Sequence, residues 1–300
     1  MIWSGDNPAH IAKAAQLLAQ GRLLAFPTET VYGLGADALQ EEAVLAIYAA
    51  KGRPTDHPLI VHIADPEDAA YFADPIPDFA WKLLRAHSPG PLTLILPRRA
   101  GVADASAAGQ SSIGLRCPSH PVAQALLRAA RALGVRGVSG PSANRFGRVS
   151  PTRSEHVVSE FGPELDVLDG GACAVGIEST IIDCSRGQPV LLRPGMLDAA
   201  TLSRTAGLEI WTPAQAALAL GKATPKASGT LDSHYAPNAR VRLLSVVEME
   251  QAAQGWTSEQ LAQVVAWSPY PPQTTGLTWR AMPADPALDR KSTRLNSSHT

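Results

Sequence analysis

Basic side chains stand at the ends of predicted helices and strands, next to glycine and proline. They are Lys51, Arg53, Arg116, Arg145, Arg148 and Arg193. Several strand ends of an α/β sheet converge on one crevice, where ligands usually bind. Four of these residues suit such a crevice if their strands are neighbours: Lys51, Arg53, Arg116 and Arg193. A triphosphate carries about four negative charges, and arginine contacts phosphate oxygens through paired hydrogen bonds. The pattern predicts an anion site, although each arginine taken alone also fits a solvated surface charge.

Two stretches combine small polar side chains with glycine. In Phe26-Pro-Thr-Glu-Thr-Val-Tyr-Gly-Leu-Gly an apolar strand should stop at Pro27, because proline cannot donate a ladder hydrogen bond. We expect Gly33 and Gly35 to permit a sharp turn or a close approach to a ligand. The second stretch is Gly140-Pro-Ser-Ala-Asn, whose hydroxyl and amide groups could wrap a phosphate or a ribose. Each stretch alone fits an ordinary polar turn about equally well.

Several kinds of catalytic site are excluded by missing motifs. The chain has no GxxxxGK[ST], no GxSxG and no HExxH, which excludes a P-loop, a nucleophile elbow and that metalloprotease site. Cys117 and His120 are close in sequence, but a thiol nucleophile also needs an oriented base and an anion hole. His62 lies in an apolar strand and fits a core histidine unless its face opens into the crevice.

Composition narrows the class of protein further. The chain has 300 residues, of which 45% are hydrophobic and 18% charged, so we expect a packed large domain and a smaller one. A net charge of -1 excludes a general polyanion binder, and RNA could be contacted only weakly, at a local basic patch. Three cysteines without CxxC spacing indicate reduced thiols and a cytoplasmic location. We found neither a signal peptide nor an apolar run of the roughly 18 residues that span a bilayer, so no membrane contact is expected.

Hydrophobic periodicity places these residues on a series of helices and strands. Helices are expected at 8–20, 40–50, 121–133 and 155–161, with two short pieces within 66–87. Strands are expected at 23–26, 59–63, 92–96, 113–116, 135–138, 177–183 and 190–193. After residue 208 the composition resembles a linker that ends at His234-Tyr-Ala-Pro. A strand is then expected at 241–247, and a helix followed by a strand within 259–267.

Eight motifs in order resemble the YrdC-type threonylcarbamoyl-AMP synthases. Together with their spacing they cover about residues 8–207. They are Phe26-Pro-Thr-Glu-Thr-Val-Tyr-Gly-Leu-Gly, Lys51-Gly-Arg-Pro, Pro58-Leu-Ile-Val-His-Ile, Pro89-Gly-Pro-Leu-Thr-Leu-Ile-Leu, Gly140-Pro-Ser-Ala-Asn, Ser150-Pro-Thr, Glu178-Ser-Thr and Leu192-Arg-Pro-Gly. Ser228-Gly-Thr and His234-Tyr-Ala-Pro resemble the linker of the long, two-domain form.

The resemblance implies a twisted, open mixed sheet with helices that form a concave site. It implies a catalytic domain at 1–207 and a linker or lid at 208–237. Residues 238–288 would form the start of a small α/β C-terminal domain, which is shorter here than the family usually has. Residues 289–300 are expected to be a non-native or disordered tail. The implied activity is nucleotidyl transfer, in which L-threonine, bicarbonate and ATP give threonylcarbamoyl-adenylate and pyrophosphate. Mg²⁺ would be carried by the nucleotide, and a tRNA threonylcarbamoyl transferase complex would consume the product.

The motif matches also imply individual roles. Lys51 and Arg53 are the expected catalytic cations. The expected ATP contacts are Lys51, Arg53, His57, Ser112, Ser142, Asn144, Ser150, Arg193 and Tyr235. The expected threonine contacts are Thr30, His62, Arg116, Gly140 and Ser179. His57 departs from the family, which more often has asparagine there, and no protein-bound metal is expected.

Two other functions remain open at this point. An RNA-binding module could hold phosphates in the same basic concavity, but the near-neutral charge and 5% aromatic content disfavour it. A carbamoyl transferase would require carbamoyl phosphate, and the zinc-finger-like cysteine pattern expected beside such domains is missing.

Overall fold

The computed structural model describes residues 1–220, 225–227 and 242–281. The chain divides into two compact units, Met1–Tyr235 and Ala236–Thr300. Tyr235 and the tail 289–300 lie outside the described residues, as do residues 221–224 and 228–237 of the expected lid. The limits of the expected domains stay a prediction.

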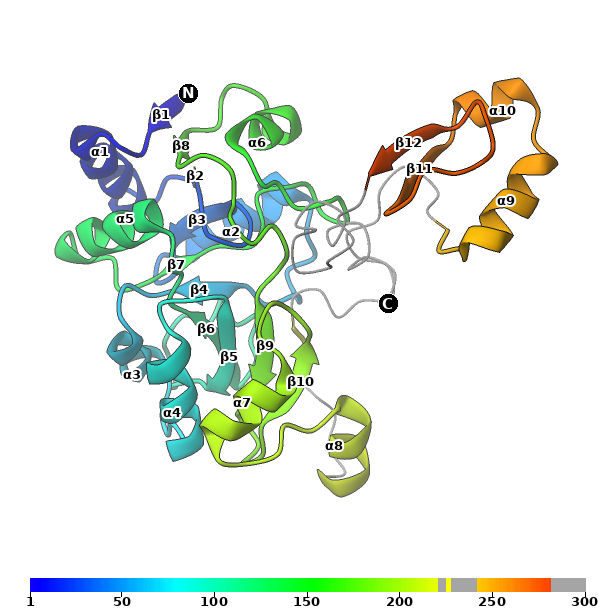
Figure 1. The fold of residues 1–300 in the computed structure, drawn as a ribbon. Helices are drawn as coiled ribbons and strands as arrows, with labels where there is room; N and C mark the ends of the chain where they lie inside the picture. Colours follow the sequence, from blue (N-terminus) through cyan, green and yellow to red (C-terminus); the bar gives the residue numbers. More distant parts are fainter. Residues whose placement is uncertain (221–224, 228–241, 282–300) are drawn as a thin grey trace. The chain divides into compact units, whose positions relative to one another are not determined.

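The first unit is built on one mixed sheet of ten strands (Figure 1). The strands run in the order β1-β8-β2-β3-β7-β4-β6-β5-β9-β10. Their bounds are β1 Ile2–Ser4, β2 Leu24–Phe26, β3 Gly33–Asp37, β4 Ile60–His62, β5 Leu92–Pro97, β6 Ser112–Arg116, β7 Val138–Ser139, β8 Val167–Asp169, β9 Thr180–Asp183 and β10 Val190–Arg193. Parallel pairs such as β4–β6 and β5–β9 alternate with antiparallel pairs such as β5–β6. The expected α/β class with a mixed sheet is confirmed.

Helices cover this sheet and connect its strands. They are α1 Pro8–Ala19, α2 Glu41–Lys51, η1 Pro66–Asp68, α3 Ala69–Phe72, α4 Asp78–His87, α5 Pro121–Ala132, α6 Ser154–Phe161, α7 Ala199–Ala206 and α8 Pro213–Leu220. Figure 1 shows that α1 lies beside α5 and that α4 lies beside α7, and both pairs are in contact. Asn7 caps α1 by accepting a hydrogen bond from the Ala9 N–H, and proline at the first helical position needs no partner for its nitrogen.

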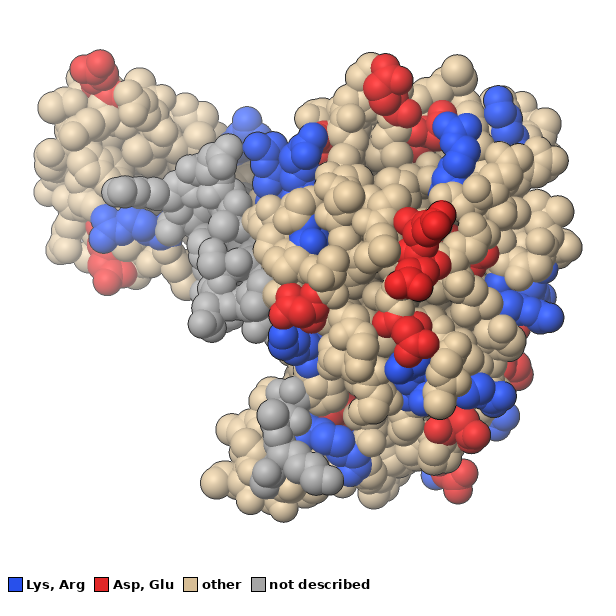
Figure 2. All heavy atoms as spheres, turned by 180° about the vertical axis from the view of Figure 1, so that it is seen from behind, with Lys and Arg blue, Asp and Glu red and all other residues tan. Residues whose placement is uncertain are grey.

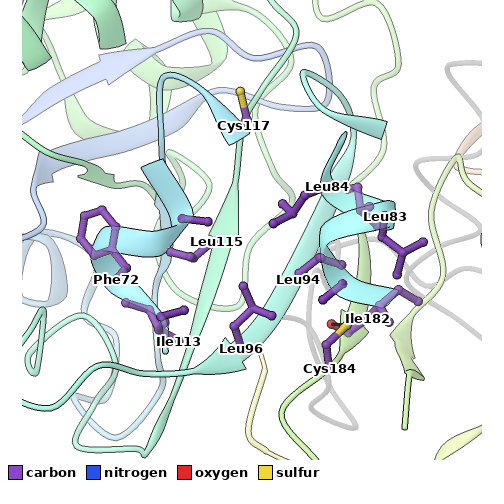
Figure 3. Close-up of a cluster of buried hydrophobic side chains, with 14 of the residues drawn as sticks. Phe72, Leu83, Leu84, Leu94, Leu96, Ile113, Leu115, Cys117, Ile182 and Cys184 are labelled. Atoms are coloured by element: carbon purple, nitrogen blue, oxygen red, sulfur yellow. Dashed lines mark hydrogen bonds between the residues drawn. The ribbon is translucent and has the colours of Figure 1, made fainter. Parts of the chain in front are cut away.

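Strand alternation sets which face of the sheet carries the site. Leu92, Leu94 and Leu96 of β5 enter a core with Phe72, Leu83, Leu84 and their neighbours (Figure 3). Since successive side chains point to opposite faces, Thr93 and Ile95 must face the other way. The same rule puts Val61, Ile113, Leu115 and Ile182 in that core. It leaves His62, Ser112 and Arg116 on the opposite face, which carries the polar residues of the predicted site.

The two glycines of the first motif do not form a turn. Gly33 and Gly35 lie within β3, and a Cβ atom on Gly35 would stand 2.9 Å from the Phe26 ring. The prediction of a sharp turn at these residues is therefore wrong, whereas the alternative, a close approach to a ligand, stays a prediction for Gly33, which lines the hollow described below. The expected strand end at Pro27 is confirmed, because β2 stops at Phe26.

Most of the other predicted elements are present, with some differences. The strand expected at 135–138 is reduced to Val138–Ser139, and β9 begins only at Thr180. Lys51 ends α2 instead of lying in the loop, and Gly52 after it takes a left-handed conformation with φ 62°. The short β1 and β8 and the helices α7 and α8 were not predicted.

The second unit contains two helices and a parallel pair of strands among its described residues. They are α9 Val246–Gln254, α10 Ser258–Ala262, β11 Val265–Ser268 and β12 Thr278–Ala281. The strand expected at 241–247 is wrong where the structure describes it, since α9 begins at Val246. Ser245 and Glu248 form a capping box, a start signal that outweighs the β-branched Val246 and Val247. The helix and strand expected within 259–267 are confirmed.

Candidate functional site

Seven of the predicted site residues meet at an open hollow of about 450 Å³. It lies where β4, β3 and β9 meet the loop after β7. The predicted residues that line it are Arg53, His62, Arg116, Gly140, Ser142, Ser179 and Arg193. Its other lining residues are Thr28, Val31, Gly33, Ile60, Pro141 and Glu178. Three arginines thus share one hollow with a single carboxylate among its lining residues.

Arg116 is a buried cation held by the first motif. Its Nη2 lies 2.6 Å from Glu29 Oε1, and its Nη1 donates to Thr30 Oγ1 at 2.8 Å. The second oxygen of Glu29 accepts from the Ser119 N–H at 3.1 Å. Thr30 does not itself line the hollow. It lies beside Thr28, whose Oγ1 is 3.0 Å from Thr30 Oγ1. The Thr-Glu-Thr sequence therefore fixes the guanidinium at the base of the site.

His62 presents a neutral acceptor to the same hollow. Burial, with a smaller effect of the Arg116 charge, lowers the pKa of His62 to about 3. Its other interaction is with the backbone of Val138, and its Nδ1 is buried without a hydrogen-bond partner among the described residues. A Cβ atom on Gly140 would stand 2.9 Å from that Nδ1. Glycine at this position therefore leaves the His62 nitrogen room for a ligand.

Lys51 lies behind the loop after β7 and does not line the hollow. Its ammonium donates to the carbonyl oxygens of Ser142 and Asn144. Burial, followed by the nearby Arg53 charge, lowers the pKa of Lys51 to about 7. The Asn144 amide nitrogen donates to the carbonyls of Arg145 and Arg148, and its Oδ1 is buried with no partner among the described residues. Lys51 and Asn144 therefore shape the loop that brings Ser142 to the hollow.

Arg53 reaches the hollow from the turn after α2. Its Nε and Nη2 donate to the carbonyls of His57 and Pro58 at 3.2 and 3.0 Å. The Phe146 ring lies under the guanidinium at 5.7 Å, and the His57 ring lies 5.6 Å from Phe146. Burial, then Arg53, lowers the pKa of His57. These contacts orient Arg53 toward the hollow and leave His57 beside it.

Glu178 belongs to the motif Glu178-Ser-Thr, but the sequence assigned it no role. The structure places it among the residues that line the hollow. It accepts a hydrogen bond from Ser150 Oγ at 2.6 Å, and its other oxygen lies 3.8 Å from Arg193 Nη2. Arg193 also donates to Ser179 through Nε and Nη2. Arg193 ends β10 at a register shift, a β-bulge that lets both Leu192 and Arg193 face the site. Alternation along the strand could not have predicted this.

A second hollow of about 310 Å³ continues from Ile60 along the same face. Ser112, another predicted contact, lies here with Gln110 and Thr93. Ile95, Ile181 and Ala227 supply an apolar surface. Two hydrogen bonds hold Lys226 there. Its Nζ donates to Asp56 Oδ2 at 2.6 Å, and its backbone N–H donates to Gln110 Oε1. Lys226 and Ala227 of the linker therefore border this second hollow.

The described residues contain neither a cluster of metal ligands nor a helix that could span a membrane. Among the described residues, no group of three or more His, Cys, Asp or Glu side chains could hold a metal ion. No helix in the described ranges is long and apolar enough to cross a membrane. The three cysteines are free thiols, with Cys117 and Cys184 buried and Cys173 partly exposed.

Comparison with known proteins adds independent support. A Sua5/YciO/YrdC family model, described as telomere recombination, matches residues 16–195. The chain belongs to this family. A second model, described as the C-terminal domain of threonylcarbamoyl-AMP synthase, matches residues 196–292, so the two-domain form of the Sua5/YciO/YrdC family expected from the motifs is confirmed.

Named relatives of the Sua5/YciO/YrdC family are similar over most of the chain. A threonylcarbamoyl-AMP synthase of Pyrococcus abyssi is 43% identical over 231 residues, or 76% of this chain and 66% of the relative. One of Bacillus subtilis is 41% identical over 78% of this chain and 66% of the relative. The crystal structure of P. abyssi Sua5 complexed with L-threonine has a TM-score of 0.82 and 33% identity, covering 100% of this chain and 88% of that one. This chain thus spans about two thirds of the length of these sequence relatives.

Proposed function

We propose that this protein is a threonylcarbamoyl-AMP synthase, which forms threonylcarbamoyl-adenylate and pyrophosphate from L-threonine, bicarbonate and ATP. The observation that carries the proposal is the buried Arg116 in a hollow that also receives Arg53 and Arg193. One amino-acid carboxylate and several phosphates can be neutralised there at once. The printed names of the relatives and the L-threonine in the P. abyssi Sua5 complex support this reading.

The threonine end of the site is assigned to the base of the first hollow. Arg116, held by Glu29 and Thr30, would receive the substrate carboxylate through paired hydrogen bonds. Ser179 lines the same wall, and Gly140 leaves space above His62. His62 is neutral at physiological pH, and in the tautomer with its proton on Nε2 the unpartnered Nδ1 accepts a hydrogen bond. It would therefore accept a hydrogen bond from the hydroxyl or the amine of the bound threonine.

The nucleotide end is assigned to the other side of the first hollow and to the second hollow. Arg53 and Arg193 would contact phosphate oxygens, with Ser142 and Ser150 on the neighbouring loop. Lys51 and Asn144 would act there through the loop that they hold. The second hollow, with Ser112 and the apolar surface around Ile95, would hold the nucleoside. The roles of His57 and Tyr235 stay predictions.

The chain's own groups suit the proposed reaction without a covalent nucleophile. The threonine amine must lose a proton before its lone pair attacks the carbon of bicarbonate, from which water leaves, or carbon dioxide that bicarbonate forms by losing water. Glu178 is the carboxylate in the hollow that can accept that proton. A carbamate oxygen then attacks the α-phosphorus, and the bond to the leaving pyrophosphate breaks. Positioning and charge neutralisation by Arg53 and Arg193 would supply most of the rate enhancement.

Several finer parts of the proposal rest on the sequence. Mg²⁺ would enter with the phosphates of ATP, whose charge it would help to neutralise. The linker around residues 208–237 would close over the site and exclude water from the carbamate. A tRNA threonylcarbamoyl transferase complex would consume the adenylate, in the cytoplasm.

Direct RNA binding remains the weaker alternative. Figure 2 shows one face of the molecule, on which Lys and Arg side chains are interspersed with Asp and Glu side chains. An RNA surface would require phosphate contacts whose affinity falls steeply with salt. The alternating charges on the visible face do not favour it.

Omission assays test the proposed function. Purified protein should release pyrophosphate from ATP only when L-threonine and bicarbonate are both present. Arg116→Met should abolish the threonine-dependent release of pyrophosphate, while the exposed Arg85→Met serves as a control. ATP binding without threonine-dependent pyrophosphate release would refute the proposal, as would salt-sensitive RNA binding without ATP turnover.

A further inference from the structure

The hydroxyl of Thr93 contacts the wall of the site, although no motif assigned it a role. Thr93 is fully buried in the middle of the sheet, on the face opposite the leucines of β5. Its Oγ1 lies 2.8 Å from Ser179 Oγ. Ser179 lines the first hollow, whereas Thr93 borders the second. The Thr93–Ser179 hydrogen bond therefore joins the walls of the two hollows.

Counting hydrogens shows which direction of this hydrogen bond suits a ligand. A serine hydroxyl has one hydrogen and two acceptor lone pairs. Arg193 Nη2 donates to Ser179 Oγ at 2.9 Å, and a guanidinium can only donate, so one lone pair is used. Whichever way the Thr93–Ser179 bond runs, one hydroxyl hydrogen, on Thr93 or on Ser179, has no acceptor among the described residues. A ligand oxygen in the first hollow would give the Ser179 hydrogen an acceptor and avoid a cost of about 1–3 kcal/mol, so with such a ligand bound Thr93 is the donor and uses the second lone pair of Ser179.

The consequence is that, with Thr93 as donor, Ser179 can only donate to a ligand. Both of its lone pairs are engaged by Thr93 and Arg193, so its single hydrogen is left to point into the hollow. Two incoming hydrogen bonds also polarise the hydroxyl and strengthen it as a donor. Such a group binds a carboxylate or carbonyl oxygen and cannot accept from an ammonium group. The amino acid would then lie with its carboxylate, and not its amine, between Ser179 and Arg116.

We propose that Thr93 is a positioning residue that fixes Ser179 as a hydrogen-bond donor to the carboxylate of the amino-acid substrate. The proposal rests on the function proposed above and adds to it a residue outside the substrate contacts. Ser179 also accepts a hydrogen bond from Arg193, which is assigned to the nucleotide. Thr93 therefore positions a serine that lies between the threonine end and the nucleotide end of the site.

Thr93→Val tests the proposal, because valine keeps the shape of threonine and removes the hydroxyl. Without Thr93 as donor, Ser179 can rotate its hydrogen away from the hollow. We expect the dissociation constant and the KM for L-threonine to rise roughly three- to tenfold, the equivalent of one hydrogen bond. The kcat should change less than twofold, and the KM for ATP should rise less than the KM for L-threonine, although Thr93 also borders the second hollow. Thr93→Ser keeps the hydroxyl and should restore the affinity for L-threonine.

Thr180→Val provides a matched control. Thr180 is the next residue after Ser179 and is also buried, but its Oγ1 donates to the Leu197 carbonyl and accepts from the Leu197 N–H. Its loss should lower the unfolding temperature and leave the affinity for L-threonine unchanged. Equal affinity in Thr93→Val and wild type, or equal loss in Thr180→Val, would overturn the role of Thr93. If calorimetry shows that wild type itself does not bind L-threonine, the proposed function fails, and the role of Thr93 fails with it.

Discussion

The buried pair of Glu29 and Arg116 offers a quantitative test of how the site is built. The atoms Nη2 and Oε1 are 2.6 Å apart, and the side chains are only 4% and 8% exposed. At an effective dielectric constant of about 20, two unit charges at this distance attract by about 6 kcal/mol, most of which offsets their desolvation. Arg116→Met leaves the Glu29 carboxylate buried without its cation. We therefore expect this variant to lose about 3–5 kcal/mol of unfolding free energy.

A double-mutant cycle separates the pair from its surroundings. Urea unfolding, followed by circular dichroism, gives the unfolding free energy of wild type, Arg116→Met, Glu29→Gln and the double variant. The double variant should be at least about 2 kcal/mol more stable than the sum of the single losses predicts. The exposed pair Arg85 and Glu67, 3.7 Å apart, is the control, and its coupling should stay below about 1 kcal/mol. Additive losses at Glu29 and Arg116 would refute the view that they form one buried unit.

Three further predictions concern the rest of the site. Arg53→Ala and Lys51→Ala should each lower turnover at least about 100-fold with an unchanged circular dichroism spectrum, and normal turnover in a folded variant would contradict their roles. His62 has a folded pKa of about 3 against about 6.5 when unfolded, so the unfolded chain binds the extra proton between these values. Stability should thus fall by about 2 kcal/mol from pH 6.5 to 4.5, a slope that His62→Gln should flatten. In Gly140→Ala the new methyl would meet His62 Nδ1, so the KM for L-threonine should rise without an equal loss of stability, as kinetics and thermal melting would show.

The part of the site that follows from regular strands could be predicted from the sequence. His62, Ser112 and Arg116 reach one face because alternation sends Val61, Ile113 and Leu115 into the core. The stop of β2 at Pro27 follows from the missing N–H of proline in the same direct way.

The remaining features depend on contacts between distant residues. The bulge in β10 that turns Arg193 toward the site leaves no local signal in Val190–Arg193. The placement of Lys51 behind the loop, with its ammonium on the carbonyls of residues 142 and 144, depends on packing across more than 90 positions of sequence. The capping box of Ser245 and Glu248 could be recognised in the sequence, but the β-branched Val246 and Val247 favoured a strand.

The most direct test of the central claim follows the carbon atom of bicarbonate. Wild-type protein is incubated with ATP, L-threonine and ¹³C-bicarbonate, and the adenylate fraction is analysed by mass spectrometry. The proposed function predicts an adenylate that contains threonine and one ¹³C atom, formed in step with pyrophosphate and missing from the Arg116→Met reaction. An adenylate without the label, or pyrophosphate release that does not need bicarbonate, would contradict the claim that this hollow joins all three substrates.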